Sequence, residues 1–275
     1  MRTQLEKARA FRALHERPGV FVIPNPWDAG TAKLLASLGF ESLATTSLGF
    51  ANTLGRVDGA NAVGRDEVLD NCRLIAGATD LPVSADLENC YADAPAAAAR
   101  TIALAAEAGM VGGSIEDATG NANKPIYDFD FAVERVRAAV AAARALPFPF
   151  MLTARAENFL HGRPDLDDTL KRLQAFERAG ADVLYAPGLK DLATIRAVVA
   201  AVKKPLNVLM ASADPALTVR DLGEAGVKRI STGSGLARLG LAAFMRGARA
   251  LKDQGSFAWI AEAIPSRELK DVFGR

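Results

Sequence analysis

Cysteine and histidine are scarce in this chain, which has two of each among 275 residues. Cys72 and Cys90 form no C-x-x-C pair, and two thiols in a chain of this size do not make a disulfide framework. We therefore expect both thiols to be reduced, with structural packing as their role.

A charge excess and a long apolar run are also missing. The sequence has 33 basic and 32 acidic residues, whereas a nucleic-acid binder usually shows a basic excess. No apolar run approaches the roughly 18 residues of a membrane-spanning helix. Charges interrupt the segment 1–17, which lacks the apolar middle region of a signal peptide. We expect a cytoplasmic protein that binds neither nucleic acid nor membrane.

The chain does show a regular alternation of short β-branched runs with longer Ala- and Leu-rich amphipathic stretches. Alternation of this kind predicts βα units and a parallel sheet. The predicted strands are Val20–Pro24, Ser42–Ser47, Pro82–Glu88, Val111–Asp117, Phe150–Glu157, Asp182–Ala186, Leu206–Met210 and Arg229–Thr232. The predicted helices are Asp28–Leu38, Arg65–Ala76, Ala94–Ala108, Phe131–Ala143, Leu166–Ala179, Leu192–Val202, Thr218–Ala225 and Ser234–Leu251.

Length and connections favour a closed barrel. An α/β barrel has roughly 250 residues, and several of the predicted helices end in a glycine that can cap the helix before the next strand. An open doubly wound sheet would show a Gly-rich turn after the first strand, but the chain reads Pro24-Asn25-Pro26-Trp27-Asp28 there. We predict one domain, residues 1–275, with the (β/α)8 TIM-type barrel fold. A barrel needs no helix at Phe257 to Val272, so we expect this segment to pack on a neighbouring subunit.

Acidic residues cluster at the ends of neighbouring predicted strands, where barrel enzymes place their active sites. Alternate side chains of a strand share a face, so Asp86 and Glu88 face the same way, and Glu116 and Arg155 have matching positions on the next two strands. We expect three carboxylates and one guanidinium to meet at the mouth of the barrel.

Carboxylates that converge in a low-dielectric pocket repel each other unless they take up protons or a cation neutralises them. Hard oxygen ligands of this kind suit Mg2+ or Mn2+. We predict that Asp86, Glu88 and Glu116 hold such an ion, which would polarise a carbonyl or stabilise an enolate, and that Arg155 binds a substrate carboxylate. The alternative is that the acids form helix caps and ion pairs around the rim.

The segment Thr45-Thr46-Ser47-Leu48-Gly49 closes the second predicted strand and offers hydroxyl and backbone N–H groups to an anionic group. Asp58 follows in a loop bracketed by Gly55 and Gly59, whose glycines permit the backbone to fold over the site. A simple loop turn is the alternative for Asp58.

These residues together resemble the isocitrate lyase and phosphoenolpyruvate mutase superfamily. The resemblance is carried in chain order by Ser47-Leu48-Gly49, Asp58, Asp86-x-Glu88, Ser114-Ile115-Glu116-Asp117 and Ala154-Arg155, and it extends from Pro24 to Ser234. It implies a barrel whose terminal helix is exchanged between subunits, giving homo-dimers or tetramers. It also implies Mg2+ near Asp86, Glu88 and Glu116.

The resemblance further implies roles for individual residues. The Ser47-Leu48-Gly49 segment would hold the 2-oxo carboxylate or enolate end of a small anionic substrate, Asp58 would lie near the metal-bound substrate, and Arg155 would anchor a carboxylate. Asn207 matches an asparagine near the end of strand seven in many members. The predicted substrate-binding residues are Thr45, Ser47, Leu48, Gly49, Arg155, Asn207 and Ser234.

The loop after the Glu116 strand departs from the lyases, which carry Lys-x-Cys-Gly-His there. Residues 118–128 form a shorter loop without cysteine or histidine. Phosphonomutases have a Lys- and Asn-containing loop, which Asn123 and Lys124 loosely echo. We expect a mobile gate that excludes water. The predicted catalytic residues are Asp58, Arg155, Asn123 and Lys124, although a solvated surface lysine is the alternative for Lys124.

Three functions remain open at this point. The leading one is a Mg2+-dependent lyase that cleaves a C–C bond in a small 2-hydroxy or 2-oxo di- or tricarboxylic acid through an enolate, as isocitrate lyase-like, 2-methylisocitrate lyase-like or oxaloacetate-cleaving enzymes do. The second is P–C bond chemistry, as in a phosphonomutase or phosphonopyruvate hydrolase, for which Arg56, Lys124 and Arg238 are available cations. The third is a catalytically weak protein that binds 2-oxo acids.

Overall fold

Eight parallel strands form one nearly closed sheet in the computed structural model, which describes residues 2–59, 62–210 and 214–274. The order along the sheet is β1-β8-β7-β6-β5-β4-β3-β2. The two end strands approach each other where the Ala44 N–H donates to the Pro24 carbonyl at 3.1 Å. The strands are β1 (Phe21–Ile23), β2 (Leu43–Ala44), β3 (Val83–Ala85), β4 (Gly112–Glu116), β5 (Met151–Arg155), β6 (Val183–Tyr185), β7 (Leu206–Leu209) and β8 (Arg229–Ser231).

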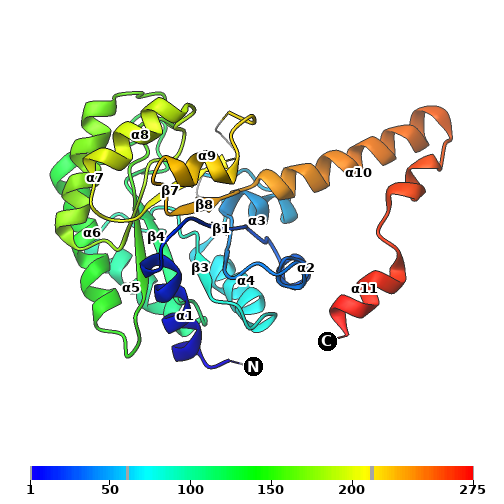
Figure 1. Ribbon diagram of the computed structural model, residues 1–275, viewed down its shortest axis with the longest axis horizontal. Coiled ribbons are helices and arrows are strands. Elements are labelled where there is room, and N and C mark those ends of the chain that lie inside the picture. The colour runs from blue at the N-terminus through cyan, green and yellow to red at the C-terminus, as the bar shows by residue number, and fades with distance from the viewer. Residues whose placement is uncertain (1, 60–61, 211–213, 275) are drawn as a thin grey trace.

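Helices fill the connections between strands and surround the sheet (Figure 1), which confirms the barrel prediction. Alanine and leucine on their inner faces pack against the outer faces of the strands in one large apolar cluster. The helices are α1 (Gln4–Glu16), α2 (Ala29–Ser37), α3 (Ser47–Thr53), α4 (Arg65–Gly77), α5 (Pro95–Glu107), α6 (Phe129–Arg144), α7 (Leu166–Ala179), α8 (Leu192–Ala201), α9 (Val219–Glu224) and α10 (Gly235–Gln254).

Helix α1 lies across the end of the barrel at which the strands begin. Its Phe11 and Leu14 are buried in a second apolar cluster with β1 residues Phe21 and Ile23 and with Val183 of β6. This apolar cluster packs α1 against the beginnings of the strands.

Two sequence expectations fail at the ends of strands. Ser47 was expected to finish the second strand, but it is the first residue of α3, because the Thr46 hydroxyl caps that helix by accepting from the Gly49 N–H at 3.3 Å. Glu88 was expected to continue the alternation of the third strand, but that strand ends at Ala85 and Glu88 has a φ of 48°. Asp86 and Glu88 therefore do not share a strand face.

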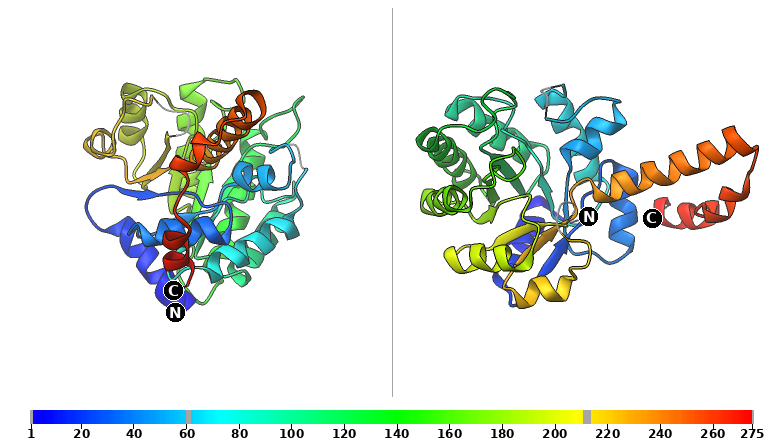
Figure 2. Two further views of the ribbon diagram at one scale, coloured as in Figure 1. Left: turned by 90° about the vertical axis from the view of Figure 1, so that its right-hand side faces the viewer. Right: turned by 90° about the horizontal axis from the view of Figure 1, so that it is seen from above.

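Helix α10 extends away from the barrel, and the chain then returns through η2 (Ala258–Glu262) to α11 (Ser266–Phe273), as Figures 1 and 2 show. The return ends beside α2, where Lys33 Nζ donates to the Phe273 carbonyl at 3.1 Å. Much of this arm is apolar and exposed; Leu239 and Phe244 of α10 have exposed fractions of 65% and 69%. In the described part of the chain, no helix combines the length and apolarity needed to span a membrane.

Candidate active site

A pocket of about 180 Å3 opens at the ends of the strands, on the side of the barrel opposite α1. Residues from all eight strands, or from the turns that follow them, contribute to it, as expected for a barrel enzyme. The predicted site residues that line it are Thr45, Ser47, Leu48, Asp58, Asp86, Arg155, Asn207 and Ser234.

Arg155 lies at the centre of a cluster of carboxylates. It ends β5, directly in register with Glu116 on β4 and Tyr185 on β6. Its NH1 group lies 2.9 Å from Asp86 Oδ1, its NH2 group 3.0 Å from Glu116 Oε2, and its Nε 2.7 Å from Glu157 Oε1. The guanidinium carbon also stacks 4.9 Å from the centre of the Tyr185 ring. One positive charge is thus surrounded by three carboxylates, so its charge is already more than balanced.

Three acids in and beside this cluster, Asp58, Glu88 and Glu116, have raised pKa values and are difficult to ionise. Burial, followed by the charge of Asp86, raises the pKa of Asp58 to about 6. Burial, followed by the charges of Asp58 and Asp86, raises the pKa of Glu88 to about 7. Burial also raises the pKa of Glu116 well above its usual range, against the opposing effect of Arg155. The cluster therefore carries an excess of acids over cations.

The donor chemistry of this cluster fits a divalent cation. No three Asp, Glu, His or Cys side chains in the described ranges converge as a complete protein cage for a metal. Mg2+ does not need such a cage, because it usually keeps several waters and takes one or two carboxylates. Asp86 lines the pocket, and Glu88 and Glu116 couple electrostatically to it. A cation beside Asp86 would stabilise the charged forms of these carboxylates against the burial and the repulsion that raise their pKa values.

The turn after β3 holds Glu88 in a strained backbone. Glu88, Cys90 and Tyr91 have φ values of 48°, 61° and 55°, in a region that residues other than glycine rarely adopt. The Tyr91 hydroxyl donates to Glu88 Oε1 at 3.2 Å, and the buried Arg135 guanidinium donates to the carbonyls of Asn89, Ala92 and Asp93. Strain of this kind is concentrated at functional sites, where the surrounding contacts maintain it.

The start of α3 forms another wall of the pocket. The Ser47 N–H donates to Asp86 Oδ2 at 3.0 Å, and the Ser47 hydroxyl lies 3.4 Å from Asp58 Oδ2. Thr45 Oγ1 accepts from the Asp86 N–H at 2.8 Å. Gly49 lies behind this wall, outside the lining, where a Cβ atom would come within 2.5 Å of Thr46 Cγ2. Its close packing explains glycine at this position without substrate contact.

Asn207 lines the pocket, and both ends of its side-chain amide are hydrogen-bonded to other residues of the protein. Its Oδ1 accepts from Arg229 Nε at 2.8 Å, and its Nδ2 donates to Ser231 Oγ at 2.9 Å. Sequence reasoning missed Arg229, which also lines the pocket. The available signal was strand alternation, because Arg229 and Ser231 have the same parity on β8.

Asn123 and Lys124 lie outside the residues that line the pocket. Lys124 Nζ is 2.6 Å from Asp128 Oδ2 in an exposed pair. Their loop is a small hairpin, in which an antiparallel bridge joins Ala118 to Ile126 and the Thr119 N–H donates to the Pro125 carbonyl at 2.9 Å. The structure therefore places these two predicted catalytic residues on the outer part of the loop, away from Arg155.

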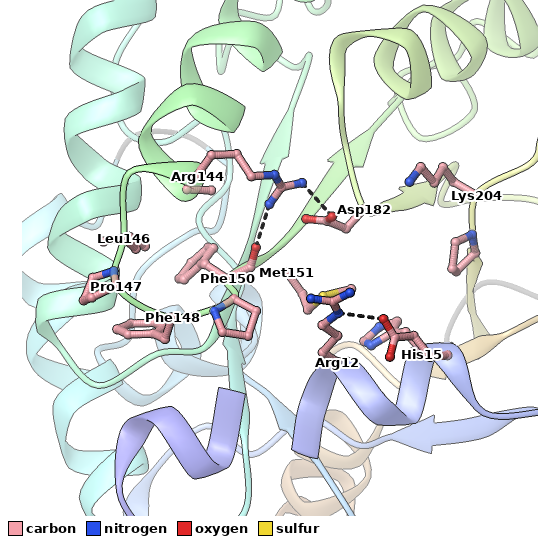
Figure 3. Close-up of a pocket in the computed structure, with 14 residues that line it drawn as sticks. Arg12, His15, Arg144, Leu146, Pro147, Phe148, Phe150, Met151, Asp182 and Lys204 are labelled. Atoms are coloured by element: carbon pink, nitrogen blue, oxygen red, sulfur yellow. Dashed lines mark hydrogen bonds and ion pairs between the residues drawn. The ribbon is translucent and has the colours of Figure 1, made fainter. Parts of the chain in front are cut away.

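A larger pocket of about 670 Å3 lies at the opposite, α1 end of the barrel (Figure 3). Its charged groups are largely paired with each other, with Arg12 Nε 2.6 Å from Glu16 Oε1 and Arg144 NH2 2.6 Å from Asp182 Oδ1. Because barrel enzymes work at the other end of the strands, and because no excess of acids gathers here, we assign the catalytic site to the smaller pocket.

Comparison with known proteins agrees with the geometry. The family model described as phosphoenolpyruvate phosphomutase matches residues 11–252. The 2-methylisocitrate lyase of Escherichia coli K12 is 30% identical over 229 residues, which cover 80% of this chain and 75% of the lyase.

Solved structures add two further likenesses. A candidate lyase/mutase from Burkholderia cenocepacia J2315 is 56% identical, with a TM-score of 0.96 over 99% of this chain and 97% of the other. An oxaloacetate acetylhydrolase solved with its product oxalate is 27% identical, with a TM-score of 0.88 over 98% of this chain and 94% of the other.

Proposed function

The chain belongs to the phosphoenolpyruvate phosphomutase family, within the isocitrate lyase and phosphoenolpyruvate mutase superfamily, and from this premise we propose that it is a Mg2+-dependent lyase. The proposed reaction cleaves a C–C bond in a small 2-hydroxy or 2-oxo di- or tricarboxylic acid and passes through an enolate. The observation that carries the proposal is the cluster of acids at the mouth of the barrel. Asp86 and Glu116 contact Arg155, and the charge of Asp86 helps to raise the pKa values of Asp58 and Glu88.

The bound cation would supply charge stabilisation for the oxyanion of the enolate. We propose that Asp86, Glu88 and Glu116 hold the cation, directly or through water. Arg155 keeps two of these carboxylates in position through its bonds to Asp86 and Glu116. Ser47 fixes the other oxygen of Asp86, so that the orientation of this carboxylate is set from both sides.

Asp58 is the group we propose for proton transfer. Of the two carboxyl groups that line the pocket, Asp86 pairs with Arg155, whereas Asp58 makes only the bond to the Ser47 hydroxyl among the side chains of the described residues. A carboxyl group whose pKa is raised to about 6 can accept and return a proton near neutral pH. Thr45, Leu48 and Ser234 also line the pocket and are proposed to contact the carboxylate end of the substrate.

P–C bond chemistry is the second candidate, because the matching family model carries the mutase description. The pocket favours the lyase. The cations that the sequence offered for a phosphonate are engaged elsewhere, because Arg56 is bonded to Glu67 at 2.8 Å and Lys124 is paired with Asp128. Neither these two nor Arg238 lines the pocket.

Turnover of a panel with Mg2+ and with a chelator tests the proposal. The panel holds oxaloacetate, isocitrate, 2-methylisocitrate, phosphonopyruvate and phosphoenolpyruvate. We expect metal-dependent cleavage of a carboxylic substrate, and at least a hundredfold lower kcat for Asp86→Asn, on the order of 3 kcal/mol of transition-state stabilisation. Asp66→Asn, on the exposed surface of α4, is the matched control. Turnover of the phosphorus compounds alone would establish the mutase alternative, and chelator-insensitive turnover would refute the metal proposal.

The exposed apolar arm supports a proposal about assembly. Leu239, Phe244 and Trp259 line an apolar groove of about 600 Å3 between α10 and the returning segment. Contiguous apolar patches of this kind mark interaction surfaces. We propose that a second copy of the chain covers this groove in a homo-oligomer, with the C-terminal helices exchanged between subunits.

A further inference from the structure

Two guanidinium groups line the candidate active site, and their surroundings differ in charge. Arg155 contacts Asp86, Glu116 and Glu157, all within 3.0 Å. Arg229, on β8, forms no ion pair with a carboxylate in the ranges that the structure describes. Arg155 therefore contributes no net attraction for an anion, whereas the charge of Arg229 is uncompensated.

Arg229 is held entirely by neutral acceptors. Its Nε donates to Asn207 Oδ1 at 2.8 Å and its NH2 to Thr153 Oγ1 at 2.9 Å. Its NH1 lies 3.5 Å from Nε2 of His15, and the Nδ1 of that ring is 2.8 Å from the Phe11 carbonyl. Burial lowers the pKa of His15 to about 3, so the ring is neutral. With the proton on Nδ1, the ring donates to the Phe11 carbonyl and its Nε2 accepts from Arg229.

The guanidinium also has donors to spare. A guanidinium carries five N–H groups, and the three contacts within the described part of the chain engage three of them. Arg229 is 5% exposed, and that remaining exposure adjoins the pocket. Its partners Asn207 and Thr153 line the same pocket, so the guanidinium is held at the wall of the candidate active site.

An uncompensated buried charge is unfavourable for folding. An apolar side chain of similar size would avoid the desolvation penalty, and a carboxylate partner would reduce it. Groups kept in such an unfavourable state are concentrated at functional sites. Because no carboxylate of the described residues pairs with Arg229, its positive potential is available to an anion in the pocket that it lines.

We propose, on the basis of the function proposed above, that Arg229 is a specificity-determining residue that makes the pocket select ligands with two negative charges over ligands with one. The substrate class is thereby narrowed to acids that carry a second carboxylate, and the same charge would favour the oxyanion of the enolate as it forms. The charge of Arg229 acts from the β8 side of the pocket, while the proposed cation acts beside Asp86.

Paired anions of similar size test this inference. Binding of oxalate, a dianion, and pyruvate, a monoanion, is measured by calorimetry at neutral pH with excess Mg2+ for the wild type, Arg229→Met and Arg229→Lys. Coulombic energy scales with ligand charge, so we expect Arg229→Met to weaken oxalate about a hundredfold and pyruvate about tenfold. Arg229→Lys keeps the charge and should stay within about threefold of the wild type for both. Arg220→Met, at an exposed pair on α9, should change neither.

Equal fold-losses for the two anions would overturn the inference, as would a loss in Arg229→Lys as large as in Arg229→Met, because either would assign Arg229 a structural role only. If Arg229→Met does not fold, Arg229→Gln replaces it, since an amide can still bond to Asn207 and Thr153. The proposed function is tested separately by turnover. If the enzyme turns over a carboxylic substrate but Arg229→Met weakens oxalate and pyruvate equally, only the role of Arg229 is refuted. If oxalate is weakened more than pyruvate but no substrate is turned over, only the lyase proposal is refuted.

Discussion

His15 is an example of a polar residue whose behaviour follows from its surroundings. Its ring meets the rings of Phe11 and Phe21 edge-on, with centroids 4.7 and 5.0 Å away, and Arg229 lies on its open side. Burial and that neighbouring positive charge both disfavour the imidazolium, which lowers its pKa to about 3 from an ordinary 6.5.

His15 should therefore contribute a pH dependence to the free energy of unfolding. Below pH 6.5 the unfolded chain protonates His15 while the folded chain does not, so stability present above pH 6.5 is lost progressively as the pH falls toward 3. Between pH 7 and pH 5 we expect the wild type to lose roughly 2 kcal/mol more than His15→Gln, measured by urea unfolding. Other titrating groups cancel in this comparison. Parallel pH profiles for the two proteins would contradict the buried neutral ring.

The carboxylates around Arg155 show a limit of residue-level reasoning. The sequence predicted that Arg155 and the acids Asp86 and Glu116 would converge, and they do. The role predicted for Arg155, binding a substrate carboxylate, stays a prediction, but the structure shows its donors engaged by acids of the protein itself. That engagement is why the pocket needs other positive charges for an anionic substrate.

At the scale of the element, the end of α7 depends on a single glycine. Gly180 follows this helix with a φ of 103°, and a Cβ atom there would lie 3.0 Å from Val140 Cγ1 of α6. A left-handed residue at this position lets the chain turn directly into β6. The same rhythm of helix, glycine and strand was visible in the sequence, and its prediction of the βα connections is confirmed.

Gly180→Ala should therefore destabilise the protein by about 1–2 kcal/mol through backbone conformation and crowding against Val140. Gly77, the last residue of α4, gives a matched control, because its φ is not left-handed and a Cβ atom there would meet nothing within 4 Å. Gly77→Ala should be neutral or stabilising by up to about 1 kcal/mol. Thermal unfolding of both variants checks the pair. Equal effects would show that the conformation of Gly180 is not the determining factor.

Other elements could not be located from local patterns. Helix α3 starts at Ser47 because the Thr46 side chain caps it, and a seven-residue helix is too short to give a clear apolar period. The turn from Glu88 to Tyr91 adopts left-handed backbone angles that no glycine signals, because Arg135, 44 positions beyond Tyr91, holds its carbonyls. Both elements shape the pocket, and both depend on contacts that the alternation of residues does not encode.

At the scale of the whole molecule, the C-terminal arm leaves much of its apolar surface exposed. Helix α10 buries only Ala237 and Gly247 among its twenty residues, and it leaves Leu239 and Phe244 largely exposed. A helix with such an exposed apolar face is stable when another surface covers it. The sequence predicts that the segment from Phe257 to Val272 packs on a neighbouring subunit, and exchange of the C-terminal helix between subunits stays a proposal.

A charge on this face should disrupt the proposed assembly. We expect the wild type to be oligomeric by light scattering coupled to gel filtration, and Phe244→Glu to shift it to a monomer or to weaken association by at least about a hundredfold, on the order of 3 kcal/mol. Lys252→Glu, an exposed polar position on the same helix, should leave the mass unchanged. A wild type that is monomeric at all concentrations would refute the proposal.

The sequence by itself determined the order of the strands along the chain, the barrel and the cluster of acids at the strand ends, because hydrophobic period and side-chain alternation are local properties of the backbone. Tertiary structure decided which of those residues meet. The register between β4 and β5 places Glu116 beside Arg155. The position of α1 places the neutral ring of His15, and not an acid, beside Arg229. Lys124 lies outside the pocket because its hairpin pairs with itself. Charge balance in the pocket depends on such distant neighbours, and no local pattern specifies them.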